Sequence, residues 1–582
     1  MKNFLIVAFA LLAVLKVSAQ TNFYVDGMLG DDANAGTSLG TAWKTIQKAC
    51  NTATPNSVVQ IKGGTYNENV VVNVSGTLGN DITIKNYLNE VVLIDGTGTE
   101  ESTMLTVTNK NYLNFQNLII QNLTVNDAQG ILVETTGLNS STGLSFKNIT
   151  IKNINWTNNA ETIPSETDNA QGFIAYGGNG GITNLTIDSC HLFNNILGFS
   201  EAMALDGNIN GFTIRNCLIH DNTNIGIDIA GNYLVSSNPL TDCARNGVIS
   251  NNICYKNISL YATSAGIYVD GGKNVVIEKN KCYENGWGIE VGCEEDGTTD
   301  SIIVKNNLIF NNEQAGLAVG GYNEGTTGQV LNCILRNNTF YQNNSLSDGT
   351  GEISMTKAST CIFENNIFYT NSQDVLMSVD NISPQEGNVF NYNCWFTPSN
   401  NPNNITVNWK ASTYSTFSAY QAGTAQESNS IFSNPILNNP VLPIPNLHLE
   451  SGGPCIDAGN PSTLISVGET DFDGNVRITA NTIDMGGFEF NSTIGINNVL
   501  INASSFLVYP NPFSNSTTIS TTTELKNASL KIYSILGQEI KEINNISGRE
   551  IKLNKGNLIG GVYFYEFTQE NKVISKGKLI VE

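Results

Sequence analysis

Short runs of alternating apolar and polar residues recur along the middle of the chain. One phrase begins with glycine and reads GIDI at 226–229, GIYVD at 266–270, GIEV at 288–291 and GLAV at 316–319. An asparagine phrase recurs at a matching offset, at 251–254, 280–282, 306–309, 337–340 and 365–368. A period of roughly 20 to 30 residues indicates a repeat architecture, and alternation predicts strands. The pattern therefore predicts a solenoid of parallel strands.

Alternation also assigns a side to each residue of a strand. Because the flanking Ile and Val residues face the core, Asp228, Asp270 and Glu290 face outward, and Asp206 does so one repeat earlier. Aligning the repeats gives two outer columns. The first holds Glu134, Tyr176, Asp206, Ala230, Asp270 and Gly292, and the second holds Leu132, Ile174, Ala204, Asp228, Tyr268, Glu290 and Ala318.

The acidic members of these columns are the candidate catalytic residues. With rungs about 4.8 Å apart and same-face neighbours about 6.6 Å apart, diagonal pairs such as Asp228 and Asp270 lie about 8 Å apart. That spacing fits the roughly 6.5–9.5 Å between the carboxyls of an inverting glycosidase. Like charges this close raise at least one pKa, as a general acid requires. Scattered acids on a solvated strand are the structural alternative.

The turns beside these strands are long and supply further candidates. The turn 231–246 carries Tyr233 and Arg245, Lys273 follows Asp270, and Glu294 follows Glu290. The expected aromatic platforms for sugar rings are Tyr176, Tyr233, Tyr268 and Trp287. Asp206, Asp228, Asp270 and Glu294 could alternatively hold calcium, which favours oxygen ligands.

Asparagine and cysteine columns suggest how the coil is held together. Asn252, Asn280, Asn307, Asn338 and Asn366 predict a hydrogen-bonded ladder, with Cys190 and Cys217 at its place in the two preceding rungs. We expect the paired columns Cys190/Cys217, Cys254/Cys282 and Cys333/Cys361 to be buried thiols, with disulfides as the alternative for an exported protein.

Composition narrows the partners. The 582 residues carry a net charge of −22, only 14% are charged and three are His. Nucleic acid is excluded because phosphate binding needs clustered Lys and Arg. A polyanionic glycan is disfavoured unless a metal ion or a basic patch intervenes.

Residues 1–19 have a charged start, an apolar run and a small-residue end, which predicts a secretory signal. No other stretch is apolar enough to span a membrane, and we expect a monomer.

Two segments resemble known families. The cap-like opening 21–52 and the first strand from Val58 to Tyr66 resemble secreted bacterial right-handed parallel β-helix proteins, including polysaccharide lyases and glycosidases, over about 21–380. The segment around 452–489 is similar to the closing segment of such proteins, and we expect it to cap the C-terminal end of the coil. The expected all-β coil, with its caps, covers 20–490.

The C-terminal tail has a different pattern. After a polar linker, 491–505, alternating strands with turn signals predict a small β-sandwich at 506–582. Motifs such as VYPNPF at 508–513 and GGVYFY at 560–565 resemble the C-terminal sorting domain of the type IX secretion system. This resemblance implies the type IX machinery as a partner and a secreted or surface-attached protein.

Three functions follow, all with a polysaccharide as partner. The first is a glycoside hydrolase, in which two of Asp206, Asp228, Asp270 and Glu290 are the catalytic pair. The second is a calcium-dependent lyase, in which Lys273 or Arg245 is the base and the acids hold the ion. The Gly-His-Gly motif of polygalacturonases, another family on this fold, is missing. The third function is a glycan-binding adhesin.

Overall fold

The computed structural model describes residues 20–321, 325, 327–478, 482–490, 506–509, 511, 513–534, 538–556, 558–569 and 572–581. The expected signal, 1–19, and the linker, 491–505, lie outside these residues. The chain forms two compact units, 1–491 and 492–582. Among the described residues, no helix is both long and apolar enough to cross a membrane.

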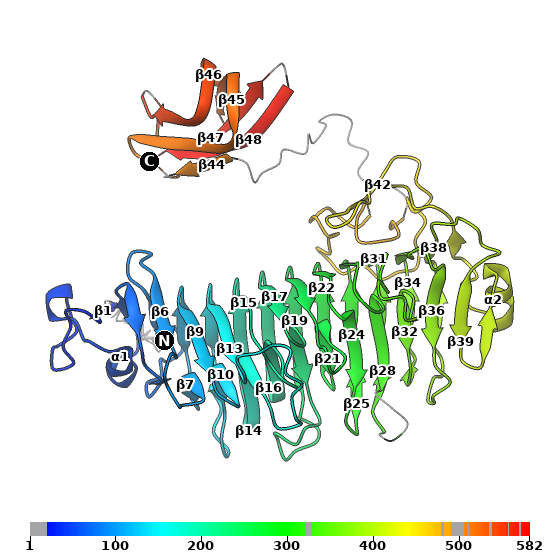
Figure 1. Cartoon of the computed structure of the whole chain (residues 1–582), viewed down its shortest axis with the longest axis horizontal. Helices are drawn as coiled ribbons and strands as arrows, with labels where there is room; N and C mark the ends of the chain where they lie inside the picture. The colour runs from blue at the N-terminus through cyan, green and yellow to red at the C-terminus, as the bar shows by residue number, and fades with distance from the viewer. Residues whose placement is uncertain are drawn as a thin grey trace, which may run out of the picture. The chain divides into compact units, whose positions relative to one another are not determined.

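The first unit is the expected parallel β-helix, whose coils follow one another from β1 to β39 in Figure 1. Each full coil contributes a strand to three walls, as β18, β19 and β20 do before β21 starts the next coil. Wall 1 carries the site described below. Its strands are β4 (Val70–Val71), β7 (Thr103–Thr108), β10 (Ala128–Glu134), the first parts of β14 (Ala170–Asp188) and β16 (Met203–Arg215), β18 (Ile227–Ala230), β21 (Ala265–Asp270), β24 (Trp287–Cys293), β28 (Leu317–Gly321), β32 (Ile353–Met355), β36 (Val375–Val379) and β39 (Thr406–Trp409).

Walls 2 and 3 complete the coil. Wall 2 consists of β1 (Thr21–Val25), β2 (Ser57–Ile61), β5 (Ile82–Asn86), β8 (Leu113–Gln116), β12 (Leu144–Lys147), the second parts of β14 and β16, β19 (Ala244–Ser250), β22 (Lys273–Glu278), β26 (Ile303–Lys305), β30 (Ile334–Arg336), β34 (Ile362–Glu364) and β37 (Val389–Asn391), flanked by β11 (Ser141–Thr142), β25 (Thr298–Asp300), β29 (Gln329–Leu331) and β33 (Ala358–Ser359). Wall 3 consists of β3 (Gly64–Tyr66), β6 (Val92–Asp95), β9 (Ile119–Thr124), β13 (Thr150–Asn155), β15 (His191–Phe193), β17 (Leu218–Asn222), β20 (Ile253–Asn257), β23 (Lys281–Tyr283), β27 (Leu308–Phe310), β31 (Thr339–Tyr341), β35 (Ile367–Tyr369), β38 (Cys394–Phe396) and β41 (Ile431–Phe432).

The outer columns on wall 1 have the expected register. Asp228 pairs with Tyr268, Tyr268 with Glu290, and Glu290 with Ala318. Tyr176 pairs with Asp206, and Ala230 with Asp270. The intervening Ile and Val residues of β18, β21 and β24 are fully buried in one continuous core. Alternation therefore predicted the geometry of this wall correctly.

Among the described residues, two buried asparagine ladders of five or more members run along the coil, where the sequence predicted one. Asn252, Asn280, Asn307, Asn338 and Asn366 form the expected ladder, in which each amide donates to the carbonyl oxygen of the next. The left-handed backbone belongs to the residue before each of them, for example Asn306. The second ladder consists of Asn195, Asn222, Asn257, Asn285, Asn312 and Asn343.

Each ladder ends on a buried glutamate. Asn343 donates to Glu352, and the first ladder continues through Asn393 to Glu427. A carboxylate fits this place because the last amide still has an N–H to donate and no further Asn to receive it. Burial raises the pKa of Glu352 to about 8 and that of Glu427 to about 7.

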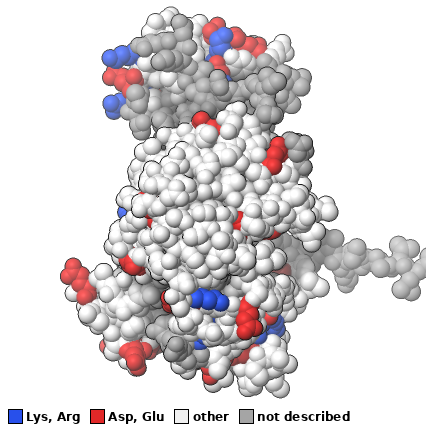
Figure 2. Space-filling view, turned by 90° about the vertical axis from the view of Figure 1, so that its right-hand side faces the viewer, with Lys and Arg blue, Asp and Glu red and all other residues white. Residues whose placement is uncertain are grey.

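The two ends of the coil are closed by small helices. At the start, α1 (Ile46–Thr52) buries Ile46, Ala49 and Cys50, after the one-turn helix η1 (Leu39–Thr41). At the far end, β39 turns into the antiparallel strand β40 (Ser412–Tyr414), and α2 (Phe417–Thr424) packs Tyr420 against Trp409. Figure 2 looks onto this α2 end, which shows mostly uncharged residues.

Residues 436–478 and 482–490 lie along wall 3 and do not cap the end of the coil as expected. Their hairpin, β42 (Leu437–Asn439) and β43 (Asn446–Leu449), and Phe488 cover Leu308, Phe310 and other apolar residues of wall 3. Asn306 donates to the carbonyl of Thr470, and Arg336 forms a salt bridge with Glu469 at 2.8 Å. The outer side of wall 3 is apolar here, so it needs this cover, which we call the strap.

All eleven cysteines of the chain lie within the described residues, and all are buried and free. Cys254 and Cys282 are direct partners on β20 and β23, as the columns predicted. The structure therefore has the buried thiols and not the disulfides.

The second unit contains five antiparallel strands around a core of its own. Its strands are β44 (Phe506–Tyr509), β45 (Ser516–Ser534), β46 (Glu539–Asn554), β47 (Gly561–Gln569) and β48 (Lys572–Val581). The order is β44-β45-β47-β48, with β46 also paired to β45. β45 pairs with β44, β46 and β47, and its pairing with β46 shifts register several times. The core of this unit includes Ile519, Leu530 and Phe567.

Candidate functional site

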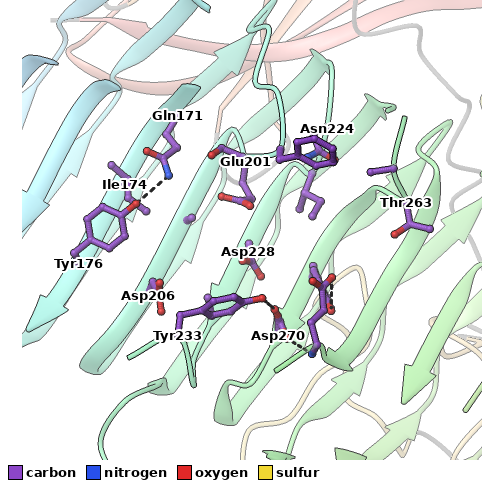
Figure 3. Close-up of a pocket in the computed structure, with 18 of the residues that line it drawn as sticks. Gln171, Ile174, Tyr176, Glu201, Asp206, Asn224, Asp228, Tyr233, Thr263 and Asp270 are labelled. Carbon is purple, nitrogen blue, oxygen red and sulfur yellow. Dashed lines mark hydrogen bonds between the residues drawn. The ribbon is translucent and has the colours of Figure 1, made fainter. Parts of the chain in front are cut away.

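A pocket of about 550 Å³ opens on the outer side of wall 1. Its floor comes from β14, β16, β18 and β21, and turns before β16, before β21, after β18 and after β24 surround it. Figure 3 shows carboxylates from several successive coils pointing into one space. The acidic residues that line it are Glu201, Asp206, Asp228, Asp270 and Glu294.

Asp228 lies at the centre of this group and is only 6% exposed. Its Oδ1 atom is buried and has no hydrogen-bond partner. Burial, followed by the charges of Glu201 and Asp270, raises the pKa of Asp228 well above its usual range. These surroundings favour the protonated carboxyl of Asp228, which is the form that can give up a proton.

Asp270 has different surroundings, although it is only 2% exposed. Its Oδ2 accepts a hydrogen bond from the hydroxyl of Tyr233, and its Oδ1 accepts one from the backbone N–H of Glu294 at 2.8 Å. Burial and the charge of Glu294 raise the pKa of Asp270 to about 7, while the two hydrogen bonds act in the opposite direction. They stabilise the ionised form, so Asp270 is the better base of the two.

Asp206 and Glu201 form the other side of the acidic group. Burial, with the charge of Asp242, raises the pKa of Asp206 to about 7, and its Oδ1 also has no partner. Burial, with the charges of Asp206 and Glu294, raises the pKa of Glu201 to about 8. The sequence analysis missed Glu201 because it precedes β16 in a turn, where alternation assigns no side. The one sequence feature that could have identified Glu201 is its position five residues before Asp206, in the same coil.

The strand wall is less solvated than expected. The predicted outward direction of Asp206, Asp228 and Asp270 is correct, but the surrounding turns cover them. The turn after β18 is held by buried Asp242, which accepts hydrogen bonds from the N–H groups of Leu234 and Ser236, both at 2.7 Å. This turn carries Tyr233 to Asp270.

Tyr176, Tyr233 and Tyr268 line the pocket as expected. Tyr176 accepts a hydrogen bond from Gln171, and Tyr268 donates to Glu294 at 3.3 Å. Phe199 and Tyr261, which the sequence analysis did not select, form an edge-to-face pair at the rim, with ring centroids 5.4 Å apart. The pocket thus combines acids with aromatic surfaces, as carbohydrate sites do.

Glu290 and Trp287 belong to a second, smaller pocket of about 190 Å³. It shares Tyr268 and Thr263 with the first pocket and extends to Ser354 and Thr356 on the following coils. Burial and the charge of Glu294 raise the pKa of Glu290 to about 8. Glu290 and Trp287 therefore lie beside the acidic group and do not line the main pocket.

Lys273 and Arg245, the expected lyase bases, do not line either pocket. Gly271, with a φ of +83°, turns the chain away from wall 1, so Lys273 begins β22 of wall 2 and pairs with Arg245 there. The guanidinium of Arg245 donates to the backbone carbonyls of Thr241 and Cys243 and to Asn208. Proximity in sequence to Asp270 was misleading because the wall changes between them.

The described residues contain no group of three or more His, Cys, Asp or Glu side chains arranged to hold a metal ion. Asp206, Asp228, Asp270 and Glu294 share the pocket without converging on one point. The expected calcium site thus remains a prediction.

Comparisons with known proteins agree with this fold. A family model described as a right handed beta helix region matches residues 241–340, and the secretion system C-terminal sorting domain matches 507–582. The tail is therefore the expected type IX sorting domain.

Similar solved structures include pectate lyase Pel9A, at 16% identity and a TM-score of 0.40, covering 82% of this chain and 98% of that chain. GH136 lacto-N-biosidase from Eubacterium ramulus is 14% identical with a TM-score of 0.37, covering 65% and 64%. The mannuronan C-5 epimerase AlgE6 A-module of Azotobacter vinelandii is 14% identical with a TM-score of 0.37, covering 60% and 80%. At these scores the likenesses carry no information on activity.

A curated relative is much closer in sequence. YwoF of Bacillus subtilis (strain 168), described as an uncharacterized protein, is 31% identical over 416 residues, which are 69% of this chain and 86% of YwoF. The chain therefore belongs to the same family as YwoF.

Proposed function

We propose that this protein is an extracellular glycoside hydrolase that cleaves an uncharged polysaccharide, with Asp228 as general acid and Asp270 as general base. The contrast between these two carboxyls carries the proposal. Asp228 has a buried oxygen without a partner, whereas both oxygens of Asp270 accept hydrogen bonds. Two carboxyls whose surroundings favour opposite protonation states are what acid–base catalysis requires.

The register of the strands suits an inverting reaction. Asp228 pairs with Tyr268, and Asp270 lies two residues further on the same strand as Tyr268. Their backbones are therefore about 8 Å apart. An inverting pair needs about 6.5–9.5 Å between its carboxyls, which leaves room for a water molecule. Asp228 gives its proton to the leaving oxygen of the glycosidic bond. Asp270 takes a proton from the water that attacks the sugar carbon on the opposite face.

The charge of the pocket favours an uncharged glycan over a uronate. None of the described residues that line it is Lys, Arg or His. A uronate carboxylate would therefore meet five acidic side chains with no cation to neutralise it. The same feature disfavours a lyase, which needs a base and a cation at this place.

The C-terminal sorting domain indicates where the protein acts. The sorting domain supports export by the type IX machinery, so we place the substrate outside the cell, with the protein secreted or attached to the surface.

A substrate screen of the full chain tests the proposal. Neutral and uronate polysaccharides are incubated with and without a chelator, and new reducing ends and unsaturated ends are measured. We expect reducing ends from a neutral glycan, unaffected by the chelator and lost in Asp228→Asn. Unsaturated ends that disappear with the chelator would instead establish the calcium-dependent lyase. Binding without cleavage would establish the adhesin.

A further inference from the structure

We propose that the smaller pocket beside the acidic group is a second subsite, which binds an uncharged sugar unit of the same chain through Trp287 and Glu290. This inference rests on the proposed function, because it takes the main pocket to be the place of cleavage. It assigns Glu290 to binding, whereas the sequence analysis placed it among the catalytic candidates.

The indole N–H of Trp287 is the first observation. Trp287 is 9% exposed, and its Nε1 atom is buried without a hydrogen-bond acceptor. Leaving a buried donor unpaired is unfavourable, so the site lacks a partner that a ligand can provide. The Trp287 side chain lines the pocket, although its Nε1 atom is covered in this structure. A ligand oxygen therefore supplies the missing acceptor once the indole ring turns toward the pocket.

The floor of the pocket is the second observation. Tyr268, Trp287 and Ala318 belong to one apolar cluster on the outer side of wall 1, separate from the core of the coil. Apolar surface with a few polar groups at its edge is the surface that a sugar ring recognises. Here the polar groups are the Glu290 carboxyl and the side chains of Ser354 and Thr356.

Trp287 faces outward because of the glycine that follows it. A Cβ on Gly288 would lie 2.4 Å from Ile309 and 2.9 Å from the ladder residue Asn312, so position 288 faces the interior. Gly292 makes room for Tyr268 in the same way, since a Cβ there would lie 2.8 Å from its ring. The GIEV phrase that defines the repeat therefore also shapes this pocket.

The two pockets are successive along the axis of the coil. The main pocket lies over β14 to β21, and the second lies over β21 to β32, with Tyr268 lining both. Since neighbouring strands are about 4.8 Å apart, a ligand that fills both pockets must extend along the axis. The substrate is therefore a linear chain whose sugar units beyond the cleavage point contact Trp287.

The charge around the second pocket selects the chemistry of that unit. None of the described residues that line it is Lys, Arg or His. An acidic sugar would bring its carboxylate next to the Glu290 carboxyl in a pocket whose described lining offers no cation to neutralise it. A hydroxyl can donate to Glu290 and accept from the Trp287 indole, so an uncharged sugar satisfies both.

Binding by the full chain carrying Asp228→Asn tests the subsite without cleavage. The probes are neutral β-linked gluco-, manno- and xylo-oligosaccharides from di- to hexasaccharide, with oligogalacturonates as the acidic counterpart, and the readout is calorimetry. We expect affinity for one neutral series to rise with length. In Trp287→Phe, which keeps an aromatic ring and removes the donor, the gain with length should shrink about five- to tenfold. Glu290→Gln should also reduce the gain in affinity with chain length.

Trp156→Phe is the matched control. Trp156 also has a buried Nε1 atom without a partner but lines neither pocket, so its replacement should leave the length dependence unchanged. An equal gain with length in Trp287→Phe and the parent would overturn the subsite, as would tighter binding of the oligogalacturonates.

Cleavage assays separate this inference from the proposed function. If the Asp228→Asn chain shows the Trp287-dependent gain while the wild-type chain cleaves none of these glycans, the subsite is supported and hydrolysis fails. If the wild-type chain cleaves and Trp287→Phe has the same preference for chain length, the subsite fails and hydrolysis is supported. If the chain neither binds nor cleaves any of them, both proposals are overturned.

Discussion

The hydroxyl of Tyr233 donates a hydrogen bond to Oδ2 of Asp270, 37 residues further along the chain. Tyr233 comes from the turn after β18, and Asp270 is the last residue of β21. The hydrogen bond therefore connects this turn to the strand wall. The tyrosine stabilises the ionised form of its partner and thereby influences when Asp270 can act as a base.

Removing that donor should shift the pH dependence of activity. In Tyr233→Phe, the pKa of Asp270 rises because its carboxylate loses a hydrogen bond. A base must be ionised to work, so the acidic limb of the kcat/KM profile should move to higher pH by about one unit. Tyr283→Phe, in the aromatic stack of wall 3, should leave the profile in place. An unmoved limb in Tyr233→Phe would exclude Asp270 as the base.

Replacing the acid should abolish activity without unfolding the chain. We expect Asp228→Asn to lower kcat about 10²- to 10⁴-fold, the contribution of general acid catalysis. Because ionised Asp228 is unfavourable in its buried place, the variant should melt no lower than wild type at pH 8. Asp300→Asn, on wall 2, should retain full activity. Retained activity in a folded Asp228→Asn chain would remove Asp228 from the mechanism.

Asp242 should act through Tyr233. Asp242→Ala leaves the N–H groups of Leu234 and Ser236 without their acceptor, so the turn loosens, at a cost of about 1–3 kcal/mol. We expect the same shift of the acidic limb as in Tyr233→Phe. In a double-mutant cycle the two changes should be strongly non-additive. Additive effects would show that the turn does not position Tyr233.

The glutamates that end the two ladders should make folding weaken as pH rises. Both folded pKa values, about 8 for Glu352 and about 7 for Glu427, lie above the usual value of 4.5. Between pH 4.5 and the folded pKa values, the folded state therefore holds more protons than the unfolded state. The free energy of unfolding falls from about pH 4.5 to pH 8. Thermal melting across this range should show the decline.

The pocket acids contribute a decline of the same sign, so variants are needed to separate them. Glu352→Gln combined with Glu427→Gln should flatten part of the pH dependence without changing activity. A melting curve as steep as that of wild type would show that both ladders end on ionised glutamates.

The regular part of the site was predictable, and the irregular part was not. A period of two fixed the side of Asp228 and Asp270, and inward Ile and Val residues made the register between coils unambiguous. Glu201 and Asp242 lie in turns, where no periodicity assigns direction. Lys273 was misplaced because a single turn at Gly271 moves the chain to another wall.

The strap shows a similar limit. Its resemblance to closing segments indicated its presence, whereas its position depends on the apolar outer side of wall 3. That side is created by Phe310 and Tyr341, which stand next to the Asn phrases. Alternation does not distinguish an outward aromatic residue that is solvated from one that is covered by a distant segment.

The strap also changes how the coil is expected to come apart. Successive turns of a solenoid ordinarily contact only their neighbours, so each can fray separately. Here Thr470 bonds to Lys279 and Asn306, Glu469 to Arg336, and Asn460 to Glu364, so one segment joins four successive turns at once. The C-terminal half should consequently open as a single cooperative block, with uniform amide exchange protection, while the turns before β22 open one by one.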